Sequence, residues 1–290
     1  MLDVMKSRPR QQKFAQEEGP EETVKFIHKR SLGQNFLTSD VVPGWMVETG
    51  AVATTDTVLE IGPGTGMLTK ALLKAGATVI AVEADTRALS ELERIFAAEI
   101  NSGQLTLHHG DARELTPKVL GLKDRQFKVI ANIPYYLSGF LLRTLLESQV
   151  QPKTLVFLIQ KELAERIARS KKESLLSLSI KVFGQPKYVK TISRGHFQPS
   201  PKVDSAILLI SEINQDHFKN VSTDYFFKLL HLGLGNKRKQ LLSNLSKTYN
   251  RGVLESIFKK LKISLTVRGE DVTLEKWLEL NQSLSNEAGT

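Results

Sequence analysis

Cysteine is absent from the 290-residue chain. Its absence excludes disulfides, thiolate zinc sites and cysteine nucleophiles. No apolar run approaches the roughly 18 residues that indicate a membrane-spanning helix, so no membrane partner is expected. The composition is compatible with a reducing setting, and we expect a cytoplasmic protein.

The first 22 residues lack the features of a targeting segment. Signal peptides have an apolar centre and transit peptides are poor in acidic residues, whereas this segment mixes basic residues with four glutamates, Glu17, Glu18, Glu21 and Glu22. We interpret residues 1–22 as a solvated, flexible tail. With 41% hydrophobic residues, the chain can bury one substantial core and a smaller satellite.

Strand and helix patterns alternate through the first two thirds of the chain. Short apolar runs rich in β-branched residues predict strands at 57–61, 78–83, 105–109, 128–132 and 154–159. Helical stripes lie between them, among them one at 86–100. This alternation predicts an α/β fold with a mostly parallel sheet covered by helices on both faces.

The pattern changes towards the end of the chain. Segments 188–193 and 203–210 flank a proline-rich turn, so they are expected as two strands antiparallel to each other. After Ser211, helical stripes appear at 225–234, 237–246, 253–261 and 273–284. We therefore predict domains at 23–211 and 212–290, the second small and helical.

A glycine-rich turn follows the first predicted strand. Residues 58–66 read as an apolar strand that enters Gly62, Gly64 and Gly66, and Glu83 ends the next strand 21 residues after Gly62. Glycines let the backbone approach a ligand, and a carboxylate at the neighbouring strand end can accept hydrogen bonds from two ribose hydroxyls. The pattern predicts a site for an adenosine-bearing cofactor, although a plain strand-to-helix turn has the same glycines.

The spacing of the turn discriminates between cofactors. A dinucleotide site has G-x-G-x-x-G and places pyrophosphate on the helix N-terminus. Here the order is G-x-G-x-G, and Glu60 precedes the turn, where an anion would be repelled. A cofactor with a cationic, amino acid end fits better, and S-adenosylmethionine has one.

A second motif, Asn132 to Tyr136, ends the fourth predicted strand. The exocyclic amine of adenine is a poor nucleophile, so an enzyme must hold it with hydrogen-bond acceptors. The Asn132 amide oxygen and a carbonyl beside Pro134 can accept from the amine, because proline stiffens the turn. Tyr135 can stack on the base. An ordinary strand-ending turn is the alternative interpretation.

Five further residues lie near the ends of predicted strands. Asp111 can accept a hydrogen bond from the cofactor's adenine amine, and the Ala112 N–H can donate to its ring. Phe197, on the proline-rich loop, is either core or the second face of a clamp for a flipped base opposite Tyr135. His108 and His109 lack partners at metal-ligand spacing and are interpreted as structural, so no metal is expected.

The net charge of +9 is unevenly distributed. Residues 51–116 carry 5 Lys and Arg against 9 Asp and Glu, whereas residues 117–202 carry 16 against 5. This asymmetry predicts attraction of a polyanion to the second half, which a merely solubilising surface explains less well. The RNA-binding candidates are Arg166, Arg169, Lys202, Lys237 and Arg238.

Taken together, these motifs resemble the small-subunit (16S) ribosomal RNA adenine N6,N6-dimethyltransferases, from about residue 25 to the end. The matching segments, in the family's order, are 33–37, 60–66, Glu83, 110–112, 132–136, 160–162 and 197–205. Three segments depart from the family's pattern. Ile133 stands where the family usually has leucine. Residues 236–240 are a looser form of the family's basic run, and residues 173–183 lack the Tyr-Gly pair that the family often has there.

The resemblance implies a Rossmann-like class I methyltransferase fold, with 23–211 binding S-adenosylmethionine and 212–290 binding RNA. It implies transfer of four methyl groups to two adjacent adenosines in the 3′-terminal hairpin of 16S rRNA, within a 30S assembly intermediate. A monomer is expected. The cofactor contacts implied are Gln34, Asn35, Leu37, Gly62, Glu83, Asp111 and Asn132, to which the glycine turn adds Gly64.

Two alternatives stay open. A related methyltransferase could act on large-subunit rRNA, although residues 197–205 and the C-terminal helices favour the small-subunit type. A binding protein, such as an assembly or transcription factor, could keep the cofactor fold without turnover. Retention of Asn132, Pro134 and Tyr135 favours catalysis.

Overall fold

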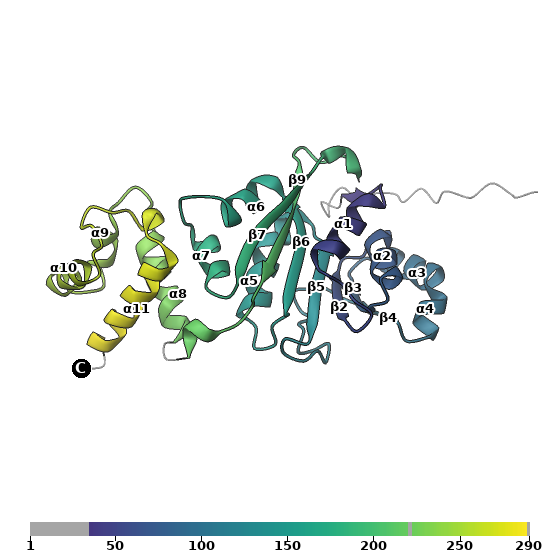
Figure 1. Cartoon of the computed structure of the whole chain (residues 1–290), viewed down its shortest axis with the longest axis horizontal. Coiled ribbons are helices and arrows are strands. Elements are labelled where there is room, and N and C mark those ends of the chain that lie inside the picture. The colour runs from purple at the N-terminus through teal and green to yellow at the C-terminus, as the bar shows by residue number, and fades with distance from the viewer. Residues whose placement is uncertain (1–34, 220–221, 289–290) are drawn as a thin grey trace, which may run out of the picture.

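The computed structural model describes residues 35–219 and 222–288, so the predicted tail and Gln34 lie outside the described residues. A seven-stranded sheet with the order β4-β3-β2-β5-β6-β9-β7 forms the centre (Figure 1). Its strands are β2 (Thr57–Ile61), β3 (Thr78–Glu83), β4 (Leu105–His109), β5 (Phe127–Asn132), β6 (Thr154–Gln160), β7 (Gln185–Ile192) and β9 (Ser205–Ser211).

Strand direction matches the sequence prediction. From β4 to β6 all neighbours pair in parallel, whereas β9 is antiparallel to both β6 and β7. The predicted mostly parallel sheet that ends in an antiparallel strand is therefore confirmed. A separate ribbon, β1 (Phe36–Leu37) paired with β8 (Phe197–Gln198), was not predicted.

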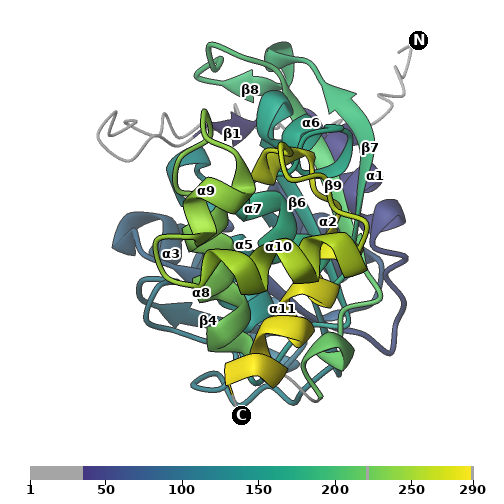
Figure 2. The same cartoon turned by 90° about the vertical axis from the view of Figure 1, so that its left-hand side faces the viewer.

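Helices cover both faces of the sheet and continue beyond it. They are α1 (Val41–Thr49), α2 (Met67–Lys74), α3 (Thr86–Ile95), α4 (Ala97–Asn101), α5 (Ser138–Glu147), α6 (Lys161–Ala168), α7 (Leu175–Lys181), α8 (Thr223–Leu234), α9 (Leu241–Leu245), α10 (Arg251–Lys260) and α11 (Leu274–Ala288). Figures 1 and 2 show α8 to α11 at one end of the sheet. Within the described ranges, no helix is long and apolar enough to cross a membrane.

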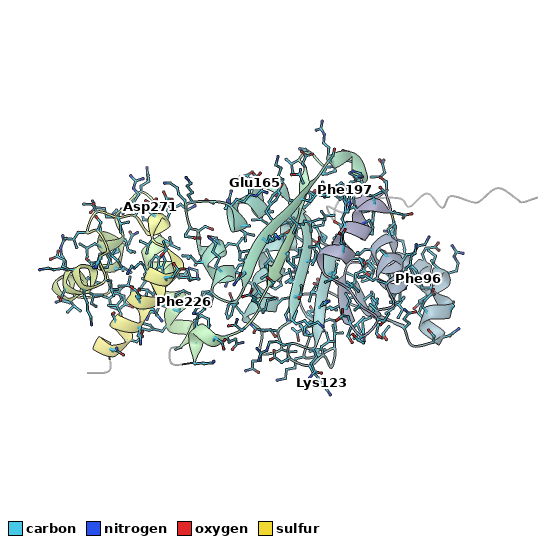
Figure 3. All side chains as sticks on the ribbon, viewed as in Figure 1. Phe96, Lys123, Glu165, Phe197, Phe226 and Asp271 are labelled. Carbon is cyan, nitrogen blue, oxygen red and sulfur yellow. The ribbon has the colours of Figure 1, made fainter. Side chains whose placement is uncertain are left out.

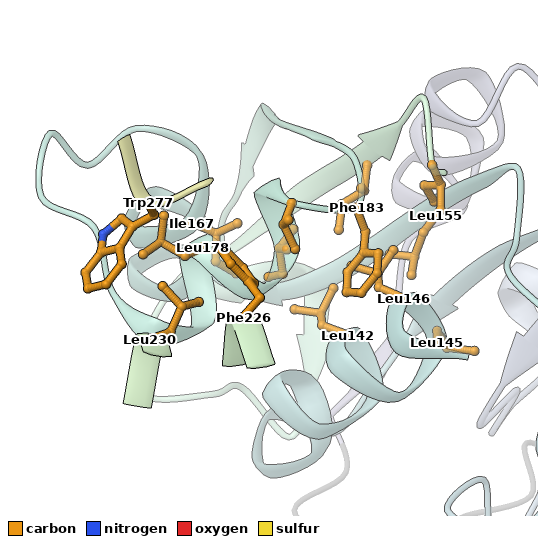
Figure 4. Close-up of a cluster of buried hydrophobic side chains, with 14 of the residues drawn as sticks. Leu142, Leu145, Leu146, Leu155, Ile167, Leu178, Phe183, Phe226, Leu230 and Trp277 are labelled. Atoms are coloured by element: carbon orange, nitrogen blue, oxygen red, sulfur yellow. The ribbon is translucent and has the colours of Figure 1, made fainter. Parts of the chain in front are cut away.

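Two cores follow from the alternation of side chains along the strands. On β6, Leu155 and Phe157 face a core that includes α5 and α7, whereas Val156 and Leu158 face a second core with α1 and α2. The first core extends without a break into the C-terminal helices, where Trp277 of α11 is fully buried (Figure 4). The division at residue 211 stays a prediction, since the two parts share this core.

Two helix predictions require correction. The stripe at 86–100 is two helices, because Phe96 (φ −106°, ψ 30°) leaves helical geometry between α3 and α4. The helix predicted at 237–246 begins only at Leu241. Gln240 is extended and bridged to Arg268, so the basic residues before it form a turn and not a first helical turn.

A buried ion cluster joins three strands at the edge of the sheet opposite their carboxyl ends. Asp56, 4% exposed, accepts hydrogen bonds from Lys128 Nζ at 2.7 Å and Lys153 Nζ at 2.5 Å. Lys128 also donates to the Ala51 carbonyl at 2.7 Å. Burial by itself would raise the pKa of Asp56, but hydrogen bonds from Lys128, Lys153 and the Ala53 N–H, together with the charge of Lys128, outweigh it and lower the pKa from 3.8 to about 2.

This cluster is expected to contribute to stability in acid. Because the folded-state pKa is the lower one, the stabilisation is complete above about pH 5 and is lost as the pH falls towards 2, by at most about 2.5 kcal/mol. Urea unfolding of the wild type and of Asp56→Asn at pH 5 and pH 3 measures it. The difference between the two proteins should shrink at pH 3, and an equal difference at both pH values would contradict this role.

Candidate active site

The carboxyl ends of β2, β3, β4 and β5 meet at one edge of the sheet, where open α/β sheets bind ligands. Two cavities adjoin there, and Gly62 and Pro134 line both. The first is narrow and is lined by Asn35, Phe36, Leu37, Glu60, Gly62, Pro63, Gly64, Thr65, Met67, Leu68, Asn132, Ile133, Pro134 and Tyr135. The second, of about 350 Å³, is lined by Glu83, Asp111 and Ala112 among others.

The glycine turn between β2 and α2 borders both cavities. Gly62 and Gly64 have φ values of +67° and +57°, a region that disfavours other residues. A Cβ on Gly64 would lie 2.8 Å from the Phe36 ring, so β1 packs closely on the turn. A Cβ on Gly62 would meet no atom within 4 Å, which means that open space lies beside this backbone.

Glu83 ties the glycine turn to the loop after β3. The carboxylate is 2% exposed, and its two oxygens accept from the Gly64 N–H at 3.1 Å and the Asp85 N–H at 2.9 Å. Each carboxylate oxygen can accept more than one hydrogen bond. Glu83 can therefore hold the loops and still accept from a diol in the second cavity.

Glu60 lines the first cavity. From the sequence alone, Glu60 is expected to be a negative charge that would repel an anionic ligand, and its surroundings in the structure change this expectation. It is 1% exposed and accepts a hydrogen bond from Thr69 Oγ1 at 2.7 Å. Burial, with a further contribution from the negative charge of Glu83, raises the pKa of Glu60 to about 8. At neutral pH this carboxyl is mostly protonated until a cation comes near.

Asn132 is positioned by a contact distant in the sequence. Its side-chain nitrogen donates to the backbone carbonyl of Asn35 at 3.1 Å. This bond leaves the amide oxygen as the group that can accept. Asn35, Asn132 and Pro134 all line the first cavity. Segment 33–37 and the Asn132 to Tyr136 motif therefore meet at this cavity.

Tyr135, the next predicted site residue, opens a short 3-10 helix, Tyr135–Leu137. Its hydroxyl shares a hydrogen bond of 2.7 Å with Ser205 Oγ at the start of β9. Burial and the nearby Asp204 charge raise the pKa of Tyr135, so the phenol stays protonated. The bond to Ser205 fixes the ring beside the first cavity, a role for Ser205 that the sequence did not reveal.

The second cavity holds Asp111 and two residues to which the sequence assigned no role. Arg113 pairs with the Asp111 carboxylate and lowers the pKa of that group. Tyr136 also lines this cavity and is 65% exposed. Its place in the Asn132 to Tyr136 motif is the sequence signal that could have identified Tyr136 as a residue of the site.

Phe197 is not brought to either cavity. It lies in β8, paired with Leu37, and is 3% exposed within the core that includes α1 (Figure 3). The hydrophobic packing of the ribbon explains its burial. A stacking role for Phe197 stays a prediction, and it requires the β1–β8 ribbon to move.

The RNA-binding candidates are spread over the surface. Arg166 pairs with Glu162, and the Arg169 guanidinium lies 3.7 Å from the centre of the Tyr188 ring. Arg166 and Lys237 line one cavity of about 200 Å³ between α6 and the loop after α8. Lys202 and Arg238 are exposed and do not line that cavity.

Known proteins share this architecture. A family model described as ribosomal RNA adenine dimethylase matches residues 25–286. The ribosomal RNA small subunit methyltransferase A of Dehalococcoides mccartyi (strain CBDB1) is 36% identical over 255 residues, covering 87% of both chains. The enzyme of the same name from Fusobacterium nucleatum is 34% identical over 262 residues, covering 89% of this chain and 97% of the relative.

Solved structures of two transferases share the fold of this chain. The crystal structure of a dimethyladenosine transferase from Plasmodium falciparum matches with a TM-score of 0.72 and 25% identity, covering 87% of this chain and 98% of that one. The 23S rRNA methyltransferase ErmE matches with a TM-score of 0.67 at 22% identity, a likeness of fold alone. On the extent of the family match and of these relatives, the chain belongs to the ribosomal RNA adenine dimethylase family.

Proposed function

We propose that this chain uses S-adenosylmethionine to dimethylate N6 of two adjacent adenosines in the 3′-terminal hairpin of small-subunit (16S) rRNA. One observation carries the proposal. Asn132, held by the Asn35 carbonyl, and Tyr135, held by Ser205, line a cavity that adjoins the Glu83 cavity at Gly62 and Pro134. An amine in the first cavity would therefore lie next to a cofactor that spans both.

The described residues fit S-adenosylmethionine chemically. Glu83 supplies carboxylate oxygens for ribose hydroxyls, and Asp111 and Ala112 border the same cavity for the adenine. Glu60 offers a carboxyl for the cationic end, and the open space beside Gly62 admits the connecting atoms. Leu37 and Gly64 complete this set of proposed contacts. Gln34 is proposed from the resemblance alone.

In the proposed mechanism a bound cofactor would supply a methyl group activated on its sulfonium, with cleavage of the sulfur–methyl bond and release of the neutral thioether, so no special general base is needed. Asn132 accepts a hydrogen bond from the adenine amine, and a carbonyl beside Pro134 accepts the second. These bonds strengthen as the nitrogen becomes tetrahedral, which lowers the barrier. Tyr135 stacks on the base and holds it in line. The amine proton leaves to solvent, and the monomethylated amine is bound again.

The proposed substrate is the rRNA within a 30S assembly intermediate in the cytoplasm, bound by a monomer. The helices after residue 211 are proposed to contact the RNA together with Arg166, Arg169, Lys202, Lys237 and Arg238. Labelled S-adenosylmethionine and undermethylated ribosomal subunits test this. Label in the small subunit is expected, whereas label in the large subunit alone would reject the proposal.

Cofactor binding is expected to release a proton from Glu60. The cationic end of the cofactor favours the ionised form of the Glu60 carboxyl. In the free protein, the pKa of about 8 keeps this carboxyl mostly protonated at pH 7. Affinity should therefore rise by up to about 50-fold between pH 6 and 8 and level off above about pH 9. Calorimetric titration at pH 7, in two buffers of different ionisation enthalpy, measures the proton. For Glu60→Gln, the binding heats in the two buffers should be equal. Equal binding heats in the two buffers for the wild type would refute the idea.

A further inference from the structure

A groove lies between α1 and β7, away from both cavities of the site. It has a volume of about 390 Å³ and is lined by Trp45, Glu48, Thr49, Lys187, Val189, Lys190, Ile207 and Leu209. Figure 1 shows β7 and β9 without a helix in front of them on this side, within the described part of the chain. Val189 is consequently 38% exposed.

The groove is basic. Lys187 and Lys190 line it, and Arg194 lies just beyond the end of β7. All three are exposed, and none of them has a carboxylate partner among the ion pairs of residues 35–219 and 222–288. Glu48 is the acidic residue of the lining. Lys190 Nζ lies 3.7 Å from the centre of the Trp45 ring, a cation–π contact that holds the ammonium over the groove. A fixed cation of this kind is suited to an anionic ligand.

A protein strand is a poor occupant for this surface. The edge strand β7 contains Pro186, lysines and an irregularity in pairing between Tyr188 and Lys190. Proline, lysine and bulges are the features that prevent another strand from pairing with an edge. Charge complementarity favours a polyanion instead.

Two contacts link the groove to the β1–β8 ribbon, which borders the first cavity. His196 meets the Trp45 ring edge-on, with centroids 6.3 Å apart, and its carbonyl accepts from the Thr38 N–H at 2.9 Å. Thr38 directly follows β1, and Phe36 and Leu37 of β1 line the first cavity. Arg194 lies in the turn between β7 and β8, and Lys190 and Lys187 lie further back on β7. An RNA strand that leaves the cavity across the β1–β8 ribbon and follows β7 would reach them in that order.

We propose that the groove between α1 and β7 binds phosphates of the rRNA strand that flanks the target adenosines. Lys187, Lys190 and Arg194 contact the backbone, and Trp45 positions Lys190. The inference rests on the proposed function, because it takes the RNA as the substrate bound in the first cavity. It adds a binding surface outside the catalytic residues and the C-terminal helices.

Charge reversal tests the groove. Lys187→Glu with Lys190→Glu should weaken binding to undermethylated small subunits on the order of tenfold, and should lower the log–log salt slope by about 1.5. The matched control is Lys70→Glu with Lys74→Glu, two exposed lysines of α2 that belong to none of the proposed RNA-binding surfaces. An effect no larger than that of the control would overturn the proposal. If the glutamate variant does not fold, the same comparison with glutamine applies.

Trp45 gives an independent readout. The chain has two tryptophans, and Trp277 is fully buried, so iodide should quench mainly Trp45. A 3′-terminal hairpin RNA with a single-stranded flank should protect Trp45 from quenching, and Trp45→Phe should remove the signal. Unchanged quenching at saturating RNA would refute the groove. Methyl transfer by the wild type, measured alongside, reports on the proposed function separately.

Discussion

Asn132→Ala is expected to slow methyl transfer about 100-fold or more in single-turnover reactions, while RNA affinity changes little. The amide oxygen is proposed to bind the amine most strongly in the transition state, so its loss raises the barrier and not the dissociation constant. Single-turnover methylation of undermethylated small subunits measures the rate of methyl transfer, and equilibrium binding measured in parallel gives the dissociation constant for RNA. Near wild-type transfer by Asn132→Ala would rule out the amine-polarising mechanism.

Tyr135 provides the comparison for Asn132. Tyr135→Ala should lose base binding together with rate, because stacking contributes about 1–3 kcal/mol per base. Tyr135→Phe keeps the ring and loses only the hydrogen bond to Ser205, so it should retain much of both. Equal losses in the two variants would mean that the hydroxyl, and not the ring, is the important group.

Glu83→Ala is expected to weaken S-adenosylmethionine binding about 30-fold, because two ribose hydrogen bonds to a charged group are lost, about 2 kcal/mol in total. The change also leaves the Gly64 and Asp85 N–H groups without their acceptor. Glu83→Gln keeps an oxygen for one of them, so it should fall between the wild type and Ala.

Calorimetric titration measures these affinities. Glu91→Ala is the control, since Glu91 pairs with Arg94 on the surface of α3 and lies outside both cavities. Circular dichroism should be unchanged in all three variants. A dissociation constant for Glu83→Ala equal to that of the wild type would remove Glu83 from the ribose site.

The sequence predicted those parts of the site that local patterns encode. Strand ends are visible as apolar runs that stop at turn residues, so Gly62, Glu83 and Asn132 could be placed at one edge of the sheet. Contacts between distant segments were not predictable. The Asn132–Asn35 bond spans 97 positions and the Tyr135–Ser205 bond spans 70, and no periodicity links such residues.

Burial accounts for the other differences. The sequence shows a carboxyl at Glu60 but not the desolvation that raises its pKa. Phe197 was open to two interpretations, core or clamp, and its pairing in the β1–β8 ribbon places it in the core. The groove beside Trp45 was also hidden, because α1 and β7 are far apart in the chain and meet only in the fold.

The central claim is the identity of the methylated nucleotides. Small subunits from a strain lacking the modification, incubated with the wild-type protein and S-adenosylmethionine, can be digested and the rRNA fragments analysed by mass spectrometry. We expect four added methyl groups, two on N6 of each of two adjacent adenosines in the 3′-terminal hairpin. Methylation at another position, or none under conditions in which the protein binds its cofactor, would contradict the account.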